Sequence, residues 1–295
     1  MDLTQLRMFC LVAEAGSVVR AAEQLHRVPS NLTTRLRQLE QELGADLFIR
    51  EKQRLRLSPI GHNFLCYAQR ILALSEEAIS MTRTGEPSGN FALGSMESTA
   101  ATRLPSLLAS YHLRYPDVTL SLITGTSGDI IDRVRAGTLA AAFVDGPVSY
   151  DELNGCKSFP EHLVLISDSH HTPIRHPQEA KDDTLFAFPA RCAYRSRLEK
   201  WFRQAGIAFG NIMEIQSYHA MLACVASGAG LALIPASVLE LLPSHERVQT
   251  HELPVDIATT ATWLIWRRDA FGPNVEALKK LMIEQSSTDT TFDQD

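Results

Sequence analysis

The sequence predicts an α/β protein in which a small helical head precedes a larger domain of strands and helices. Three observations support this: capped helices and a basic hairpin fill residues 1–58, one long helix follows, and residues 90–295 alternate strands with helices. A chain of 295 residues is long enough for more than one buried core. We therefore expect a head at 1–58, a linker helix and hinge at 59–89, and an α/β domain at 90–295.

Capping signals predict three short helices in the head. Asp2 begins the first helix and Gly16 ends it, and Ser17 begins a second helix that runs to about Leu25. Pro29 and Ser30 open a third helix, which stops at Gly44. The buried side of that helix is predicted from leucines spaced four, three and four residues apart: Leu32, Leu36, Leu39 and Leu43.

The third helix and the segment after it carry side chains that hydrogen-bond bases or phosphates. Residues 47–57 read as two short strands and a turn, with four cations and the single acid Glu51. Helices in this order followed by a basic hairpin indicate a winged helix-turn-helix, a DNA-reading device. A plain three-helix bundle with solvated arginines is the alternative. The candidate DNA contacts are Ser17, Arg27, Ser30, Asn31, Thr33, Thr34, Arg35, Arg37, Arg50, Lys52, Arg54 and Arg56.

A long helix should follow, opened by Ser58 and Pro59 and continuing to about Arg83. At ~1.5 Å per residue it is about 35 Å long, more than the head can bury. Its apolar positions alternate four and three apart, as in a coiled-coil seam: Ile60, Phe64, Tyr67, Ile71, Leu74, Ala78 and Met81. We expect this seam to form a homodimer; packing against the chain's own C-terminal domain is the alternative. The segment 85–89 then marks the domain boundary.

The charge is divided unevenly along the chain. The net charge is −6, but residues 1–84 carry +2 and the remaining residues −8, so the positive charge is local to the head. Five scattered cysteines without a C-x-x-C pair argue against a disulfide framework and a zinc site. No apolar run reaches the ~18 residues of a membrane span, and the N-terminus lacks a signal pattern. We expect a cytoplasmic protein with no membrane partner.

The larger domain should contain repeated β-α units, and hence a parallel sheet with helices on both sides. A late strand returning to the first sheet would create two lobes, roughly 90–160 plus 265–285 and 161–264. The tail from Ser286 is expected to be disordered. The expected strands are 91–96, 118–123, 140–144, 163–166, 185–188, 212–215, 231–234 and 259–266. The expected helices are 97–115, 129–136, 194–205, 217–227 and 274–285.

Hydroxyl and cationic side chains at strand ends predict a small-molecule site between these lobes. Free N–H groups at helix N-termini point into such a crevice. Helix capping explains each serine or threonine equally well. Arg191 or Arg195 would suit an anionic ligand and Glu97 a cationic one, and the sequence leaves this open. The candidate ligand-binding residues are Ser95, Ser98, Thr99, Thr126, Ser127, Arg191, Tyr194 and Ser217.

The head resembles the N-terminal domain of LysR-type transcriptional regulators. The matching residues are Leu6, Phe9, Val12, Ala13, Gly16, Ser17, Ala21, Ala22, Leu25, Leu32, Leu39, Glu40, Leu43, Gly44, Leu47, Phe48, Arg50, Leu57, Ser58, Pro59 and Gly61. The chain departs from the family at Val28-Pro29-Ser30, commonly Ser-Gln-Pro or Ser-Gln-Ser, and at Thr34, often Arg. These departures lie near the start of the recognition helix, so the operator sequence cannot be taken from relatives.

Residues 94–137 and 225–235 resemble the effector-binding domain of the same regulators, which is similar to periplasmic solute-binding proteins. In that family Ser98 and Thr126 match positions that commonly touch effectors. The resemblance implies a sequence-specific transcriptional regulator that binds a palindromic double-stranded DNA operator as a homodimer, assembles to a homotetramer and responds to a small-molecule effector. RNA polymerase is a further candidate partner.

Two other classes of protein were weighed against this one. A solute-binding protein or enzyme with the bilobed fold would use the N-terminal helices only for oligomerisation. It would need an export signal or catalytic groups, and the sequence shows neither. An architectural DNA-binding protein would leave some 200 residues unexplained. The isolated histidines, Gly228-Ala-Gly230 and Cys192 do not form a metal, nucleotide or catalytic motif, so we expect no enzyme activity and no cofactor.

Overall fold

The computed structural model describes residues 1–295 except 52–53, 82–84, 209, 244 and 293–295. The chain separates into two compact units, Met1–Gly89 with Ala136–Thr138, and Asn90–Arg135 with Leu139–Asp295. We call these the head unit and the sensor unit. Among the described residues, no helix is both long enough and apolar enough to span a bilayer.

The head unit contains the three predicted helices, and their caps follow from the sequence. They are α1 (Leu3–Ala15), α2 (Val18–Gln24) and α3 (Pro29–Leu43). The Asp2 side chain accepts a hydrogen bond from the Gln5 backbone in a capping box, and Gly16 and Gly44 end α1 and α3 in the left-handed conformation. The core includes Phe9, Val12, Leu32, Leu36 and Leu39. Leu43 was expected in this stripe but is 37% exposed, because it lies at the last position of its helix.

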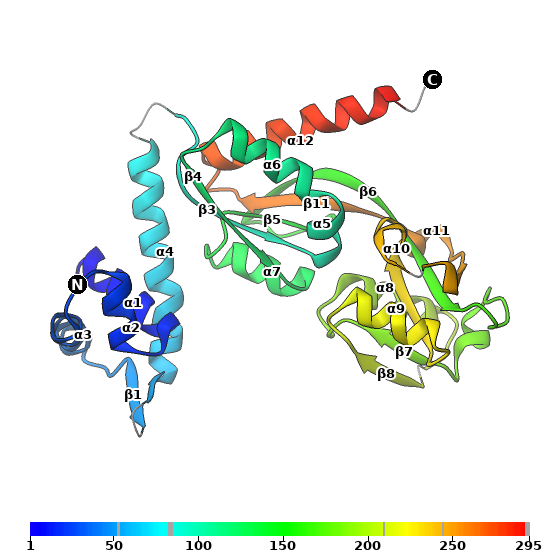
Figure 1. Ribbon diagram of the computed structural model, residues 1–295, viewed down its shortest axis with the longest axis horizontal. Helices are drawn as coiled ribbons and strands as arrows, with labels where there is room; N and C mark the ends of the chain where they lie inside the picture. Colours follow the sequence, from blue (N-terminus) through cyan, green and yellow to red (C-terminus); the bar gives the residue numbers. More distant parts are fainter. Residues whose placement is uncertain (52–53, 82–84, 209, 244, 293–295) are drawn as a thin grey trace. The chain divides into compact units, whose positions relative to one another are not determined.

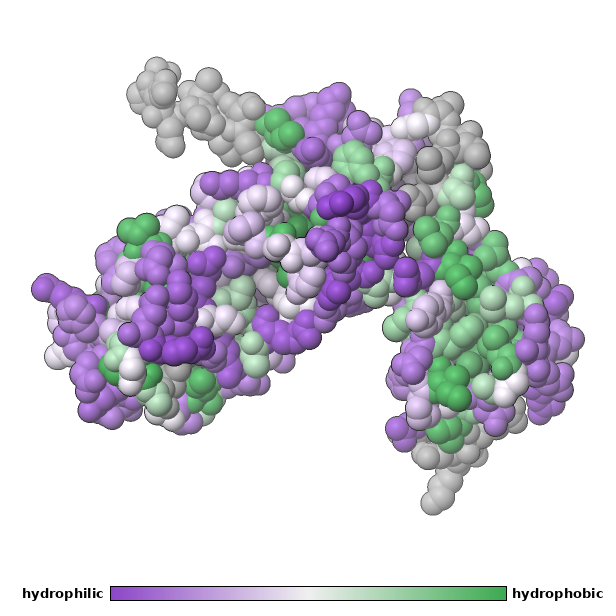
Figure 2. Space-filling model, turned by 180° about the vertical axis from the view of Figure 1, so that it is seen from behind, coloured by the Kyte–Doolittle hydropathy of each residue, from purple (hydrophilic) through white to green (hydrophobic). Residues whose placement is uncertain are grey.

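The predicted hairpin is present as β1 (Phe48–Glu51) paired antiparallel with β2 (Arg54–Leu57). Helix α4 (Pro59–Met81) follows and packs along α1 (Figure 1). The two halves of its predicted apolar seam behave differently. Phe64 and Ile71 pack against the head core, whereas Ile60, Tyr67 and Leu74, seven residues apart, are 56%, 62% and 57% exposed. Seen from behind, α4 carries a band of hydrophobic surface (Figure 2).

The sensor unit is built on one sheet with the strand order β4-β3-β5-β11-β6-β9-β7-β8, and β10 pairs with β6. Strands β3 and β5 are parallel, as are β7, β8 and β9, which agrees with the predicted β-α units. The two crossing strands, β6 (Leu153–Asp168) and β11 (Thr259–Arg267), run antiparallel to each other along the length of β11. They connect two lobes (Figure 1).

Lobe I, at one end of the crossing strands, has two core clusters built around Phe91, Phe143 and Leu264 and around Ile130 and Val144. Its elements are β3 (Gly89–Ser95), α5 (Glu97–Thr102), α6 (Leu104–Arg114), β4 (Val118–Thr124), α7 (Ser127–Arg135), β5 (Ala141–Gly146) and α12 (Pro273–Phe292).

Lobe II, at the other end, has core clusters around Trp201 and Phe202 and around Phe186 and Met221. Its elements are β7 (Thr184–Ala187), α8 (Ala193–Gln204), β8 (Asn211–Glu214), α9 (Tyr218–Ala226), β9 (Leu231–Pro235), α10 (Ala236–Leu241), β10 (Val248–His251) and α11 (Val255–Ala258), with 3-10 turns at Pro177–Ala180 and His245–Arg247.

Three expectations for the sensor unit were wrong. The single helix expected at 97–115 is divided at Arg103 into α5 and α6, because Pro105 starts a new helix rather than continuing one. The strand expected at 163–166 is the end of the much longer β6. The tail expected to be disordered from Ser286 continues α12 to Phe292.

Lobe II contains a buried histidine whose protonation should destabilise the fold. His251 Nδ1 accepts the Ile174 N–H at 3.0 Å, and Ser167 Oγ lies 2.8 Å from Nε2. Burial, and next the neighbouring His171, lower the pKa of His251 below its ordinary 6.5. The unfolded chain therefore binds this proton more readily, and we expect the free energy of unfolding to fall as the pH drops below 6.5.

This pH effect can be measured by urea unfolding followed by tryptophan fluorescence, above and below pH 6.5. Asparagine keeps an acceptor but does not titrate, so His251→Asn should show a shallower dependence than the wild type. The exposed His112→Asn is the matched control and should behave as the wild type. A wild-type profile that is as shallow as that of His251→Asn would contradict the prediction.

Candidate functional site: a nucleic-acid interface and a ligand pocket

The outward side of α3 forms a continuous exposed polar face. Ser30, Asn31, Thr34, Arg35 and Gln38 are all exposed, and each lies three or four residues from another of them, which places them on one side of the helix. The leucine stripe holds the opposite side in the core. The side chains of this face are therefore available to base edges and phosphates.

Several of these side chains already have local partners. The Thr33 and Thr34 hydroxyls donate to the carbonyl oxygens of Pro29 and Ser30, each at 3.0 Å. Arg35 Nη1 lies 3.8 Å from Asp2 Oδ2 in an exposed ion pair that is weak in water. Arg37 lines a groove of about 620 Å³ with Phe48 and Leu55 of the hairpin. Arg37 thus connects the recognition face to the wing.

The remaining predicted DNA contacts lie around this face. Ser17 caps α2, with its Oγ accepting the Arg20 N–H at 3.5 Å, and Arg27 is exposed in the turn before α3. Arg56 is exposed on β2. Arg50 and Arg54 belong to the wing strands, but their side chains lie outside the description, as does all of Lys52.

The sensor unit contains a cavity of about 250 Å³ between its two lobes. It is bounded by the starts of α5 and α7 in lobe I and by the starts of α8 and α9 in lobe II. The described residues that line it are Met96, Glu97, Ser98, Thr124, Gly125, Thr126, Ser127, Phe188, Cys192, Ala193, Tyr194, Gln216 and Tyr218.

Four of the eight predicted ligand-binding residues line this cavity: Ser98, Thr126, Ser127 and Tyr194. Ser98 is buried, and its hydroxyl lies 3.4 Å from the Tyr194 hydroxyl across the two lobes. Burial raises the pKa of Tyr194 far above its ordinary value, so this phenol stays neutral. Thr126 Oγ1 donates to Asp129 Oδ2 at 2.6 Å and Ser127 Oγ accepts the Asp145 N–H at 3.4 Å.

Three other predicted residues lie outside the lining and have structural partners. Ser95 is fully buried and donates to the Met96 carbonyl oxygen at 2.8 Å. Thr99 lies 3.3 Å from the Thr262 hydroxyl, and Ser217 caps α9 by accepting the Ala220 N–H at 3.4 Å. Helix capping, the alternative weighed from the sequence, accounts for Ser217, whereas buried hydrogen bonds account for Ser95 and Thr99.

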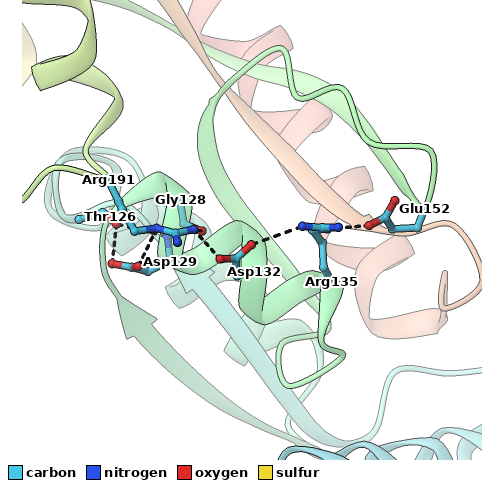
Figure 3. A network of polar contacts seen from close by, with 7 residues as sticks. All are labelled: Thr126, Gly128, Asp129, Asp132, Arg135, Glu152 and Arg191. Atoms are coloured by element: carbon cyan, nitrogen blue, oxygen red, sulfur yellow. Dashed lines mark hydrogen bonds and ion pairs between the residues drawn. The ribbon is translucent and has the colours of Figure 1, made fainter. Parts of the chain in front are cut away.

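Arg191 crosses from lobe II to the first turns of α7, where it forms ion pairs instead of facing the cavity (Figure 3). It lies 2.9 Å from Asp129 Oδ1 and 2.5 Å from Asp132 Oδ2, and it donates to the Gly128 carbonyl oxygen at 2.6 Å. The chain of contacts continues from Asp132 to Arg135, 3.5 Å away. Arg191 therefore fastens the two lobes together beside the cavity.

A second polar link between the lobes was not predicted. Arg197 of α8 donates to Asp145 Oδ2 at 3.1 Å and to Thr260 Oγ1 at 2.5 Å. Burial raises the pKa of Asp145, while Thr260 and Arg197 act in the opposite direction. The lining residues Gln216 and Tyr218 were also missed. Both residues flank Ser217 in the sequence, and this could have identified them. Residues next to a helix N-cap lie at the same helix end, which here points into the crevice.

The described residues contain no cluster of histidine, cysteine, aspartate or glutamate suited to a metal ion. Burial raises the pKa of Cys192, the lining thiol, so it is held in its less reactive form. The side chains of the cavity can bind, orient and desolvate a small molecule by hydrogen bonds and apolar contact.

A polar-faced recognition helix with a basic wing, joined to a two-lobed domain with an interlobe cavity, defines a ligand-controlled DNA-binding regulator. The profile described as "Bacterial regulatory helix-turn-helix protein, lysR family" matches residues 3–62, and that described as "LysR substrate binding domain" matches residues 84–287. The chain belongs to the LysR family and is a DNA-binding transcriptional regulator with an effector-binding domain.

Relatives match over nearly the whole chain. The uncharacterised regulator YusT of Bacillus subtilis is 36% identical and the regulator SoxR of an Arthrobacter strain is 35% identical. These matches cover 92% and 96% of this chain, and 91% and 96% of the relatives. Full-length CbnR, solved alone and with its target DNA, has a TM-score of 0.69 at 24% identity, covering 96% of this chain and 99% of CbnR. The last likeness confirms the fold.

Proposed function

We propose that two head units pair through α4 and read the two halves of a palindromic operator, in an assembly that extends to a tetramer. The observation that carries this proposal is the pair of exposed surfaces on the head: the polar face of α3 and the apolar stripe of Ile60, Tyr67 and Leu74. A heptad-spaced stripe suits a second helix, and two recognition helices one DNA turn apart suit a palindrome. The chain then consists of a DNA-binding domain at 1–58, a linker helix and hinge at 59–89, and an effector-binding domain at 90–295.

The interlobe cavity is the site where an effector acts. A ligand that binds one arrangement of the lobes better than another shifts the balance between them, and with it the spacing of the heads. The side chains in reach are Ser98, Thr126, Ser127 and Tyr194. Named relatives are regulators, which supports a role without catalysis. We place the protein in the cytoplasm, where DNA and RNA polymerase are found.

The wing assignment predicts a change in salt dependence. Arg56 lies on β2 among basic residues, so Arg56→Ala should remove about one phosphate contact and lower the slope of log affinity against log salt by ~0.9. Genome-wide footprinting would first supply an operator, and fluorescence anisotropy at several salt concentrations would then give the slope. Arg203→Ala makes the same change of charge at an exposed position of α8 and is the matched control. An unchanged slope in Arg56→Ala would refute this role of the wing.

A further inference from the structure

The interlobe cavity carries one formal charge at neutral pH among the described residues that line it, and that charge is negative. The charged group is Glu97, in the first turn of α5. The other lining groups are hydroxyls, one amide, one thiol and apolar or aromatic side chains. The charge of a bound molecule should therefore be governed by this carboxylate.

The arginines beside the cavity are already neutralised. Arg191 pairs with Asp129 and Asp132, as described above. Arg195 lies 2.8 Å from Glu199 and 2.7 Å from Glu214. Arg197 is held by Asp145. Each guanidinium has carboxylate partners within the protein, so none of the three offers an uncompensated positive charge to an anionic ligand.

Some N–H groups at the helix N-termini around the cavity are also used by the protein's own groups. Thr126 Oγ1 accepts the Asp129 N–H at 3.3 Å, and Gly128 N–H donates to the Arg191 carbonyl oxygen at 3.3 Å. At α9, Ser217 accepts the Ala220 N–H. These contacts use two N–H groups at the start of α7 and one at the start of α9, so fewer remain for a carboxylate or phosphate ligand.

Glu97, in contrast, forms no hydrogen bond or ion pair within the described part of the chain. The one charged group that acts on its pKa there is His219, an exposed residue in the first turn of α9. Burial raises the pKa of Glu97, and His219 offsets only part of this effect. A half-buried, unpaired carboxylate is a costly group unless a partner arrives to pair with it.

The wall near Glu97 suits the body of an organic cation. The Phe188 and Tyr218 rings lie with centroids 4.8 Å apart and are tilted by 54°. Both rings line the cavity, together with the buried Tyr194. Aromatic faces attract cations through their quadrupole, and the attraction grows when water is excluded. At about 250 Å³ the cavity falls just below the ~300–1,000 Å³ typical of drug-sized ligands, so the ligand should be small.

We propose that this cavity binds a small organic ammonium ion, with Glu97 as its counter-ion and Phe188 and Tyr218 against its apolar body. The proposal rests on the proposed function of the cavity as the effector site. It also resolves the alternative that the sequence left open between an anionic and a cationic ligand. The neutral hydroxyls of Ser98, Thr126 and Ser127 supply the remaining hydrogen bonds.

The test uses three probes of similar shape and different charge, benzylamine, benzyl alcohol and benzoate, with the full chain and isothermal titration calorimetry. We expect benzylamine to bind at least about tenfold more tightly than benzyl alcohol or benzoate. Glu97→Gln should abolish this preference for the amine. Glu240→Gln makes the same change on the exposed face of α10 and should leave the preference intact. Preferential binding of benzoate, no binding of benzylamine, or an undiminished amine preference in Glu97→Gln would overturn the inference.

A second variant separates this inference from the function on which it rests. Ala193→Phe places a large side chain in the cavity at the first position of α8 and should block any probe that binds there. Benzoate binding that Ala193→Phe abolishes would keep the cavity as an effector site and reject only the cationic ligand. Benzylamine binding that survives both variants would reject the cavity itself. Thermal unfolding followed by tryptophan fluorescence reports whether the sensor unit of each variant is folded, because all three tryptophans lie in that unit.

Discussion

Leu74→Asp is expected to make the chain monomeric and to lower its affinity for a full operator by about a hundredfold or more. Leu74 is 57% exposed within the stripe that it forms with Ile60 and Tyr67, so a carboxylate there does not disturb the head core. In a helix pair it would bury a charge in the apolar seam. A dimer binds two half-sites at once, and this bivalency typically raises its affinity by about 10²–10⁴. A monomer loses that gain.

The measurements are sedimentation velocity for the association state and anisotropy with operators of one and two half-sites. Ala73→Asp, one residue earlier and on a different side of α4, is the matched control and should remain a dimer. The affinity of Leu74→Asp for a single half-site should stay near that of the wild type, because α3 is untouched. A dimeric Leu74→Asp protein would show that the stripe is not the pairing surface.

Gly61→Ala is expected to destabilise the head unit by about 3 kcal/mol, a large change for a single methyl group. A Cβ at Gly61 would lie 2.1 Å from the Leu47 carbonyl oxygen, well inside van der Waals contact. That carbonyl accepts the Ser58 N–H at 2.9 Å, and Gly61 N–H donates to Ser58 Oγ, also at 2.9 Å. The first turn of α4 is therefore fixed against the start of the wing and cannot move away.

Thermal unfolding followed by helical circular dichroism and by tryptophan fluorescence would locate this effect. All three tryptophans, at 201, 263 and 266, lie in the sensor unit, so loss of the head alone changes the dichroism first. Gly44→Ala is the informative comparison, because Gly44 has a φ of +65° and open space around its Cβ position. Its cost should be only the ~1–2 kcal/mol of a left-handed backbone. Equal effects at the two glycines would contradict a steric cause at Gly61.

The head could be predicted from its sequence because its signals are local. Asp2, Gly16, Ser17 and Gly44 each determine a helix end through contacts within a few residues, and the structure has all four ends where they were expected. Which apolar residues of α4 pack against the head core and which stay exposed could not be predicted. Phe64 and Tyr67 are both apolar positions of one seam, and only the packed head shows that the first is covered and the second exposed.

The sensor unit was harder because its pattern depends on distant partners. Residues 153–162 of β6 mix exposed and partly buried positions and include Pro160, so they lack the apolar run that marked residues 163–166. Pairing with β11, almost a hundred residues later, makes them a strand. The break at Arg103 was missed although Pro105 was visible. A proline suits the first turn of a helix and not its interior, so Pro105 was the signal for the start of α6.

The candidate pocket was predicted in part, for a similar reason. Strand-end hydroxyls are visible in a sequence, and Ser98, Thr126 and Ser127 do line the cavity. The ion-pair partners of a charged side chain are not visible in a sequence. From the sequence, Arg191 suited an anionic ligand and Glu97 a cationic one, and the choice stayed open. In the structure Asp129 and Asp132 of lobe I pair with Arg191, whereas Glu97 has no ion pair among the described residues.

The antiparallel pairing of β11 with β5 and β6 has a consequence for the order in which the protein matures on the ribosome. The core of lobe I needs Leu264, Trp266 and Leu278, whereas the core of the head uses residues 6–72. The head can therefore complete its fold during synthesis, while lobe I must wait for almost the whole chain. A product truncated before Thr259 would retain a finished DNA-reading module and lose the means to sense a ligand.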